Sequence, residues 1–245
     1  MPTLHTVIPC FNENITLERS VRRLVDVPWG ADWRLRVLIV DDHSSDGSTT
    51  LAMKLDDETD LIETVALPEN LGKGGAVRVG IGLVLESAAE EDLLVIQDAD
   101  LEYDPGDLPD MVARFDGGRV DAVIGDRFHA GRKPSGLGRT HKSVNRGLTW
   151  LSNRFTGLKL EDMECCYKML STPMARKVLG ELSETRFGIE PQIAAALSRH
   201  GARVENHRIN YDARRFEDGK KIGIRDGIRA IYVIIREAFK RRAAA

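Results

Sequence analysis

The sequence predicts an α/β protein whose mostly parallel sheet is flanked by helices. In the first half of the chain, short apolar runs alternate with amphipathic segments, which is the pattern of repeated strand–helix–strand units. Acidic and small polar residues follow each apolar run, as expected where parallel strands end at one edge of a sheet. With 245 residues, 42% of them hydrophobic, the chain is long enough to bury one large core.

Five apolar runs are the predicted strands of this sheet. They are residues 4–9, 35–41, 61–67, 92–98 and 120–126. Their nearly continuous apolar character is typical of strands that are buried on both faces. Between them, apolar residues recur at helical spacing, at Leu17, Val21, Leu24 and Val25 and again at Val77, Ile81 and Leu85. Two helices are therefore expected at these positions.

The alternation becomes less regular from Gly131 onward. A basic, glycine-rich stretch at 130–142 leads into a helix predicted around 143–155. The segment CCYKML comes next, then a helix after Pro173, another near 191–200, and a strand near 203–209. Because no Pro/Ser-rich linker or internal repeat interrupts the chain, we expect one domain over residues 1–245.

Charge and cysteine content narrow the function classes. The formal net charge is −3, so no overall field attracts nucleic acid, and we expect no nucleic-acid partner. The longest apolar stretches are too short to span a bilayer, and the N-terminus lacks the pattern of a secretory signal. The three cysteines, Cys10, Cys165 and Cys166, form no metal-binding or disulfide pattern, which favours reduced thiols and a cytoplasmic location.

The segment VIQDADLEYDP places Asp98, Asp100 and Glu102 directly after a predicted strand. In an extended chain these alternate side chains point to the same side, where three carboxylates repel one another unless a cation lies between them. Carboxylates without Cys or His nearby suit Mg²⁺ or Mn²⁺. We therefore expect one of these metals, with the phosphates of a nucleotide completing its coordination. The glycines around Lys73 allow a charged ligand to approach closely.

Five segments, in this order, resemble family 2 glycosyltransferases of the GT-A fold. They are VIPCFNE, VDDHSSDGS, NLGKGGAVRVG, DADLEYDP and GDRF. The closest branch is that of dolichol- and polyprenyl-phosphate sugar synthases, whose later blocks resemble DMECCYKML, FGIEPQIAA and YDARRFEDGKKIGIRDG. The resemblance runs from about Thr6 to the end of the chain. It implies inverting, metal-dependent transfer of a hexose from a GDP- or UDP-linked sugar to a polyprenyl or dolichyl phosphate.

The resemblance also implies roles for single residues on the donor side. Residues 1–126 become the half that binds the nucleotide sugar, and the donor-binding positions in it are Pro9, Phe11, Glu13, Asp41, Asp42, Lys73 and Asp98. Asp98 and Asp100 match the DxD motif and, with Glu102, are the expected metal ligands. The metal would neutralise the charge that builds up on the leaving nucleoside diphosphate, which makes both aspartates catalytic. A mobile loop at 212–221 is expected to close over the diphosphate through Arg214 or Arg215 and Lys220 or Lys221.

Residues 127–221 form the expected acceptor-side half. A phosphate acceptor is already anionic and needs cations to hold it, whereas an alcohol acceptor needs a general base. The resemblance assigns Arg127, Arg139 and Ser143 to the lipid phosphate. Asp162 falls where alcohol-using relatives place their catalytic base, so three roles stay open for it: base, acceptor-orienting group and structural contact. The alternatives are a lipid or saccharide hydroxyl as acceptor and, more remotely, a sugar nucleotidyltransferase.

The C-terminal segment 222–245 is predicted to be an amphipathic helix. One stripe is apolar, with Ile224, Ile228, Ile231, Ile235 and Phe239. An adjacent stripe is basic, with Arg225, Arg229, Arg236, Lys240, Arg241 and Arg242. This pattern is typical of a helix that lies on the cytoplasmic face of a membrane, but it also suits a helix packed on the sheet or on a second copy. The oligomeric state is left open.

Overall fold

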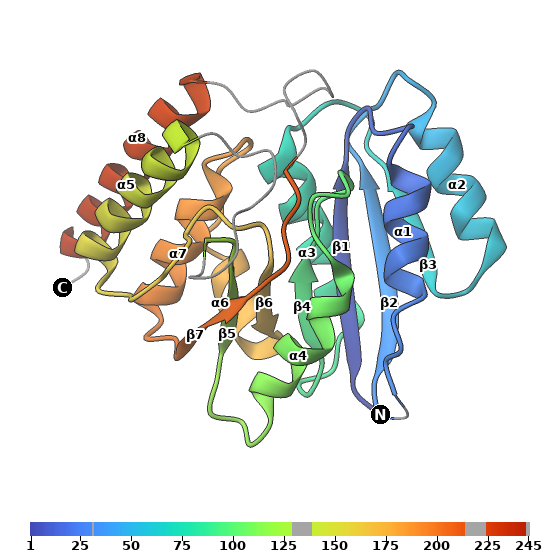
Figure 1. Ribbon diagram of the computed structural model, residues 1–245, viewed down its shortest axis with the longest axis horizontal. Coiled ribbons are helices and arrows are strands. Elements are labelled where there is room, and N and C mark those ends of the chain that lie inside the picture. The colour runs from blue at the N-terminus through green and yellow to red at the C-terminus, as the bar shows by residue number, and fades with distance from the viewer. Residues whose placement is uncertain (31, 129–138, 214–223, 244–245) are drawn as a thin grey trace.

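The fold is built on one sheet of seven strands in the order β3-β2-β1-β4-β6-β5-β7 (Figure 1). The computed structural model describes the backbone of residues 1–30, 32–128, 139–213 and 224–243, and the side chains of 1–30, 32–128, 142–213 and 226–240. The strands are β1 (Thr3–Cys10), β2 (Arg34–Asp41), β3 (Ile62–Ala66), β4 (Leu93–Ile96), β5 (Ala122–Asp126), β6 (Lys168–Ser171) and β7 (Val204–Arg208). All five strands predicted in the first half, and the strand predicted near 203–209, are present.

Strand β6 is the feature of the sheet that was not predicted. It lies between β4 and β5 and runs antiparallel to both, while β1, β2, β3 and β4 pair in parallel, as do β5 and β7. The run CCYKML gives no clear signal because β6 has only four residues and contains a lysine, Lys168, which is fully buried. The sheet is thus mostly parallel, as expected, with one reversed strand in its second half.

The helices are α1 (Leu17–Val25), α2 (Ser48–Glu58), α3 (Lys73–Ser87), α4 (Leu108–Val112), α5 (Arg139–Thr156), α6 (Thr172–Leu179), α7 (Ile189–Arg199) and α8 (Ile224–Ala243). Short 3₁₀ turns, η1 (Pro105–Asp107) and η2 (Ala113–Phe115), flank α4. The predicted apolar stripes of α1 and α3 face the core, where Leu17, Val21, Val77 and Ile81 are fully buried. Helices α5, α7 and α8 pack on one another at the end of the molecule where the C-terminus lies (Figure 1).

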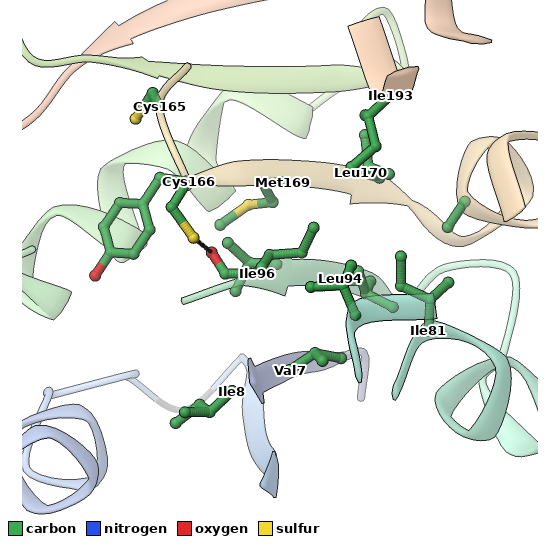
Figure 2. Close-up of a cluster of buried hydrophobic side chains, with 14 of the residues drawn as sticks. Val7, Ile8, Ile81, Leu94, Ile96, Cys165, Cys166, Met169, Leu170 and Ile193 are labelled. Atoms are coloured by element: carbon green, nitrogen blue, oxygen red, sulfur yellow. Dashed lines mark hydrogen bonds between the residues drawn. The ribbon is translucent and has the colours of Figure 1, made fainter. Parts of the chain in front are cut away.

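The core is continuous across the reversed strand. Figure 2 shows Val7 and Ile8 of β1, Leu94 and Ile96 of β4, and Met169 and Leu170 of β6 in one cluster with Ile81 and Ile193. The Cys166 thiol donates to the Ile96 carbonyl oxygen at 3.7 Å (Figure 2). Cys10, Cys165 and Cys166 are all free and buried, as expected. This packing holds the segment before β6 against the end of β4, and so brings the predicted acceptor-side residues to the predicted donor-side strand.

Candidate active site

Three sharp bends shape the carboxyl edge of the sheet. Asn12, His43 and Leu101 follow β1, β2 and β4, and each has a positive φ, of 52°, 62° and 65°. Such backbone is unfavourable for residues other than glycine and is concentrated at functional sites. The bend after β1 is fastened to the next loop, because Asn12 N donates to Ser44 Oγ at 2.9 Å and Ser45 N donates to Asn12 Oδ1 at 2.8 Å. No glycine marks these positions, so the sequence did not indicate them.

Asp41 and Asp42, predicted to bind the donor, are buried at the end of β2. Asp41 Oδ2 accepts hydrogen bonds from Thr49 Oγ1 at 2.7 Å and Ser44 N at 3.2 Å, while its Oδ1 is buried without a hydrogen-bond partner among the described residues. Asp42 Oδ1 accepts from Leu71 N at 2.6 Å, and burial raises the pKa of this carboxyl above its ordinary value. The two aspartates therefore join the loop after β2 to the loop before α3.

The predicted donor-side residues of the first strand lie beside this pair. Pro9 is paired with Val40 in the register of β1 and β2. Phe11 is exposed at the strand end. Glu13 accepts a hydrogen bond from Thr16 Oγ1 at 2.7 Å, where α1 begins.

Lys73 lies between two carboxylates at the start of α3. Its Nζ is 2.9 Å from Asp98 Oδ1 and 2.9 Å from Glu190 Oε1. Burial alone would lower the pKa of Lys73, but the charges of Asp98 and Glu190 outweigh it and hold the pKa well above the ordinary value. Burial likewise raises the pKa of Asp98, but Lys73 more than compensates, so the carboxyl stays ionised. The Lys73 ammonium thus neutralises part of the carboxylate charge that the sequence analysis expected a metal alone to neutralise.

The glycines around Lys73 allow a second segment to approach closely. A Cβ on Gly72 would lie 2.3 Å from the Thr185 carbonyl oxygen, and one on Gly74 would lie 2.6 Å from the Glu184 carbonyl oxygen. Gly72 also has a φ of 76°. The close approach of residues 184–186 brings the first turn of α7, and with it Glu190, to the lysine. The space beside Gly72 and Gly74, which the sequence analysis assigned to a ligand, is therefore occupied by protein backbone.

The three carboxylates after β4 do not point the same way, contrary to the geometry expected of extended chain. Asp100 Oδ1 accepts from the backbone N–H of Glu102 at 3.1 Å, and the left-handed conformation of Leu101 turns the chain between them. The Glu102 carboxylate accepts a hydrogen bond from the Tyr211 hydroxyl instead. Among the described residues, no three His, Cys, Asp or Glu side chains converge as a ready metal cluster.

The donor set still fits a metal that is held largely by its substrate. Mg²⁺ is usually bound by one or two carboxylates together with substrate phosphates. Asp98 and Asp100 supply two carboxylates at the end of β4, and both side chains are only partly buried. Glu102 would have to leave Tyr211 to join them.

Arg127 and Asp162 form a buried two-pronged ion pair. Arg127 Nε lies 2.6 Å from Asp162 Oδ2, and Nη2 lies 2.9 Å from Oδ1. The Asp162 side chain has no exposed surface, and the Arg127 guanidinium lies over the rings of Phe128 and Tyr211, 5.2 Å from each centroid. Of the three roles left open for Asp162, this arrangement fits the structural contact, because both carboxylate oxygens are bonded to Arg127.

A second cation approaches the same ring. Lys142 Nζ lies 5.6 Å from the centroid of Phe128, and the next residue, Ser143, is exposed on α5. Lys142 had no individual role in the sequence-based prediction, although its position beside Ser143 could have suggested one. The side chain of Arg139 and the residues Arg214, Arg215, Lys220 and Lys221 lie outside the described part of the chain.

Glu190 and Glu164 are the site residues that sequence reasoning missed. Glu190 stands in the first turn of α7, where an acidic residue is common for reasons of helix stability alone. Glu164 precedes β6, and burial together with the charge of Glu190 raises its pKa to about 8. Glu164 Oε1 and Glu190 Oε2 are both buried without a hydrogen-bond partner in the described structure. Their proximity depends on the approach of α7 to Lys73, which no local pattern reveals.

The C-terminal helix differs in part from its prediction. Its apolar stripe is exposed, with Ile228 at 63% and Phe239 at 64% of full exposure, and Ile231, Tyr232 and Ile235 also exposed. Of its basic stripe, the side chains of Arg225, Arg241 and Arg242 lie outside the described part of the chain, and the other three neutralise the protein's own acids. Arg229 and Arg236 pair with the buried Glu184 at 3.0 and 2.5 Å, and Lys240 pairs with the buried Glu237 at 3.2 Å. Within the described residues, none of the helices is long and apolar enough to cross a membrane.

Comparison with known sequences gives one family and several polyprenyl-phosphate relatives. The sequence model of glycosyl transferase family 2 matches residues 6–179. A dodecaprenyl-phosphate galacturonate synthase of Rhizobium johnstonii is 29% identical over 182 residues, or 73% of this chain and 51% of that protein. An undecaprenyl-phosphate 4-deoxy-4-formamido-L-arabinose transferase of Salmonella choleraesuis is 29% identical over 215 residues, or 87% of this chain and 61% of that protein. The chain spans about half to three fifths of the length of these relatives.

Among solved structures, glucosyl-3-phosphoglycerate synthase from Mycobacterium tuberculosis has a similar fold. Its complex with uridine diphosphate has a TM-score of 0.70 at 17% identity, covering 97% of this chain and 80% of that chain. Its complex with Mn²⁺, UDP-glucose and phosphoglyceric acid has a TM-score of 0.67 at 17% identity, with the same coverage. The likeness extends over both halves of the sheet.

Proposed function

The chain belongs to glycosyl transferase family 2 and has the GT-A fold, and we propose that it transfers a sugar from a nucleotide sugar to a polyprenyl phosphate. The observation that carries this proposal is the pairing of Asp98 with Lys73 at the end of β4, beside the buried pair of Arg127 and Asp162. The first pair suits a nucleoside diphosphate and its metal. The second offers a fixed cation to an anionic acceptor.

On the donor side, the loops after β1, β2 and β4 would enclose the nucleotide. The unpartnered Asp41 Oδ1 is an acceptor for a base N–H or a ribose hydroxyl. Asp98 and Asp100 would hold Mg²⁺ or Mn²⁺, which when bound supplies positive charge to the departing diphosphate. Lys73 lies beside Asp98 and would add a second positive charge there. Displacement by the acceptor in a single step would invert the configuration of the sugar.

On the acceptor side, the geometry favours a phosphate over a hydroxyl. A hydroxyl acceptor needs a base that is free to take its proton. Asp162 is fully buried and holds both prongs of Arg127, so it is poorly placed for that task. A phosphate oxygen is already a nucleophile near neutral pH and requires orientation and charge compensation, which Arg127 and Lys142 would provide.

We also propose that the exposed apolar side chains of α8, here called the α8 face (Ile228, Ile231, Tyr232, Ile235 and Phe239), dock on a lipid bilayer. The neighbouring helix α5 adds Trp150, which is 68% exposed, and the exposed Arg146 and Arg154. The sequence of α5 contains no acidic residue. Apolar side chains with an aromatic residue and exposed arginines match the chemistry of an anionic bilayer surface. A polyprenyl acceptor would be reached there.

The proposal is tested by incubating the protein with UDP- and GDP-linked sugars, Mn²⁺ and a polyprenyl phosphate in detergent. We expect free nucleoside diphosphate and a glycosylated lipid phosphate that is identified by mass. Pyrophosphate as the released product would support a sugar nucleotidyltransferase instead. Transfer to a polyprenol but not to its phosphate would support the hydroxyl acceptor.

A further inference from the structure

Glu190, which contacts Lys73 of the proposed donor site, and Glu164 each have a buried carboxylate oxygen without a hydrogen-bond partner among the described residues. Glu190 is 5% exposed; its Oε1 is held by Lys73, and its Oε2 has no hydrogen-bond partner among the described residues. Glu164 Oε1 is buried and unpartnered as well. Buried polar atoms in folded proteins are nearly always hydrogen-bonded to protein, ordered water or a ligand, so these two oxygens are candidates for contact with the donor.

The position of the pair indicates which part of a ligand it would meet. Lys73 connects Glu190 to Asp98, with Nζ 2.9 Å from both carboxylates. Under the proposed function, Asp98 lies at the diphosphate and its metal. The nucleoside is placed at Asp41 and Asp42 after β2, on one side of Asp98, whereas Glu164 precedes β6 on the other side in the strand order β2-β1-β4-β6. The sugar is then the part of the donor nearest to the two glutamates.

The chemistry of the pair restricts the sugar. Ionised carboxylate oxygens accept hydrogen bonds, and a sugar hydroxyl donates them. Glu164 adds to this, because its protonated form, favoured at neutral pH, can donate to a sugar oxygen while its other oxygen accepts. A sugar that carries its own carboxylate would face Glu190 and Asp98 in a poorly solvated site, where like charges repel strongly. The Lys73 ammonium compensates only part of this repulsion, since it is shared by those two carboxylates.

We infer that Glu164 and Glu190 form a sugar-selecting subsite that accepts an uncharged, hydroxyl-bearing sugar and rejects a uronic acid. The inference rests on the proposed function, because it takes the ligand to be a nucleotide sugar. This selectivity for an uncharged sugar would distinguish the chain from the relative that is named for galacturonate.

The test is isothermal titration in the presence of Mn²⁺ with three ligands of one base: the nucleoside diphosphate, its hexose and the matching uronate. UDP, UDP-glucose and UDP-glucuronate are used, or GDP, GDP-mannose and GDP-mannuronate if GDP binds more tightly. We expect the wild type to bind the hexose at least tenfold more tightly than the uronate. Glu190→Gln and Glu164→Gln should each reduce that preference at least threefold. Glu164→Gln should also leave the affinity for the nucleoside diphosphate within twofold. Glu161→Gln, which changes an exposed carboxylate in the same segment, should change none of these values.

The outcomes separate the subsite from the proposed function. Normal binding of the nucleoside diphosphate with equal affinity for hexose and uronate would overturn the subsite alone, as would an unchanged preference in both glutamine variants. No binding of either nucleoside diphosphate would overturn the donor site and the subsite together. Glu190→Gln also weakens the contact to Lys73, so thermal melting is measured for every variant. Glu164→Gln decides the question if Glu190→Gln does not fold.

Discussion

At the residue scale, we expect disruption of the buried ion pair of Arg127 and Asp162 to lower the free energy of unfolding substantially. Removing one charge of a buried pair leaves the other uncompensated, which costs about 3–5 kcal/mol. We therefore expect Asp162→Asn to lower the free energy of unfolding by that amount in urea titrations. Asp121 forms the same two-pronged contact with Arg203, at 2.9 and 2.8 Å, but at the surface. Asp121→Asn is the matched control and should cost no more than about 1 kcal/mol. Equal losses would show that burial of the pair is unimportant.

Under the proposed function, Asp100 is a metal ligand, and we expect its substitution to affect chemistry rather than folding. Its side chain is only partly buried and hydrogen-bonds to the backbone of Glu102 in the same turn. Asp100→Ala should abolish sugar transfer and weaken Mn²⁺ binding, measured by calorimetry with the nucleoside diphosphate present, while the melting temperature changes little. Near-normal turnover of this variant in saturating Mn²⁺ would exclude Asp100 as a metal ligand.

Glu164 should make stability depend on pH. Burial, followed by the charge of Glu190, raises its pKa from 4.5 to about 8, with opposing effects from Lys168 and Arg127 and a smaller raising effect from Asp162. Above pH 4.5 the unfolded chain releases this proton while the folded chain keeps it, so this residue's contribution to stability falls as pH rises towards 8. Glu164→Gln removes the effect. The unfolding free energy of the variant, relative to wild type, should therefore be higher at pH 8 than at pH 5. A difference that does not vary with pH would contradict the assignment.

At the scale of elements, the contact of α3 with the sheet depends on one glycine. A Cβ on Gly80 would lie 2.4 Å from Val7 Cγ1, whereas a Cβ on Gly82 of the same helix would meet nothing closer than 3.9 Å. Gly80→Ala should destabilise the protein by about 1–3 kcal/mol through overpacking. Gly82→Ala should stabilise it by about 0.5–1 kcal/mol, because alanine is the better helix residue. Urea unfolding of both variants measures the two effects, and a gain in both would mean that α3 is free to move away from β1.

The proposed docking of the α8 face is also a property of an element. Fully burying a large apolar side chain gains roughly 1.5–3 kcal/mol, so Ile235→Ser with Phe239→Ser should weaken sedimentation with phosphatidylcholine–phosphatidylglycerol vesicles at least tenfold. Met53→Ser, which changes an exposed apolar residue of α2, is the control and should have no effect. Unchanged sedimentation of the double variant would exclude lipid as the partner. Loss of a dimer without vesicles, seen by sizing, would identify a second copy of the chain instead.

At the scale of the whole molecule, the sequence predicted the elements that follow a local periodic pattern. It did not predict the contacts between residues that are far apart in the chain. The strands β1 to β5 and the stripes of α1 and α3 follow local periodicity, and the structure confirms them. The resemblance supplied the family, which the comparisons confirm. The contact of Glu190 with Lys73 joins residues 117 positions apart, and the reversal of β6 depends on which strands leave room for it. Neither the contact nor the direction of β6 can be predicted from a local sequence pattern. The sequence analysis identified the basic residues of α8, but it did not predict that they pair with Glu184 and Glu237.

The insertion of β6 has a consequence for synthesis of the chain on the ribosome. The edge of β4 that faces the second half is covered by residues 169–171. Both neighbours of β5 are segments that follow it in the chain, at 168–170 and 204–208. A nascent chain that ends near residue 126 therefore carries two apolar strands with open edges. Pairings between such distant segments form slowly, and open edges promote aggregation. The middle of the sheet can close only after residue 171 has emerged, so residues 1–126 should not fold to the native sheet as a separate fragment.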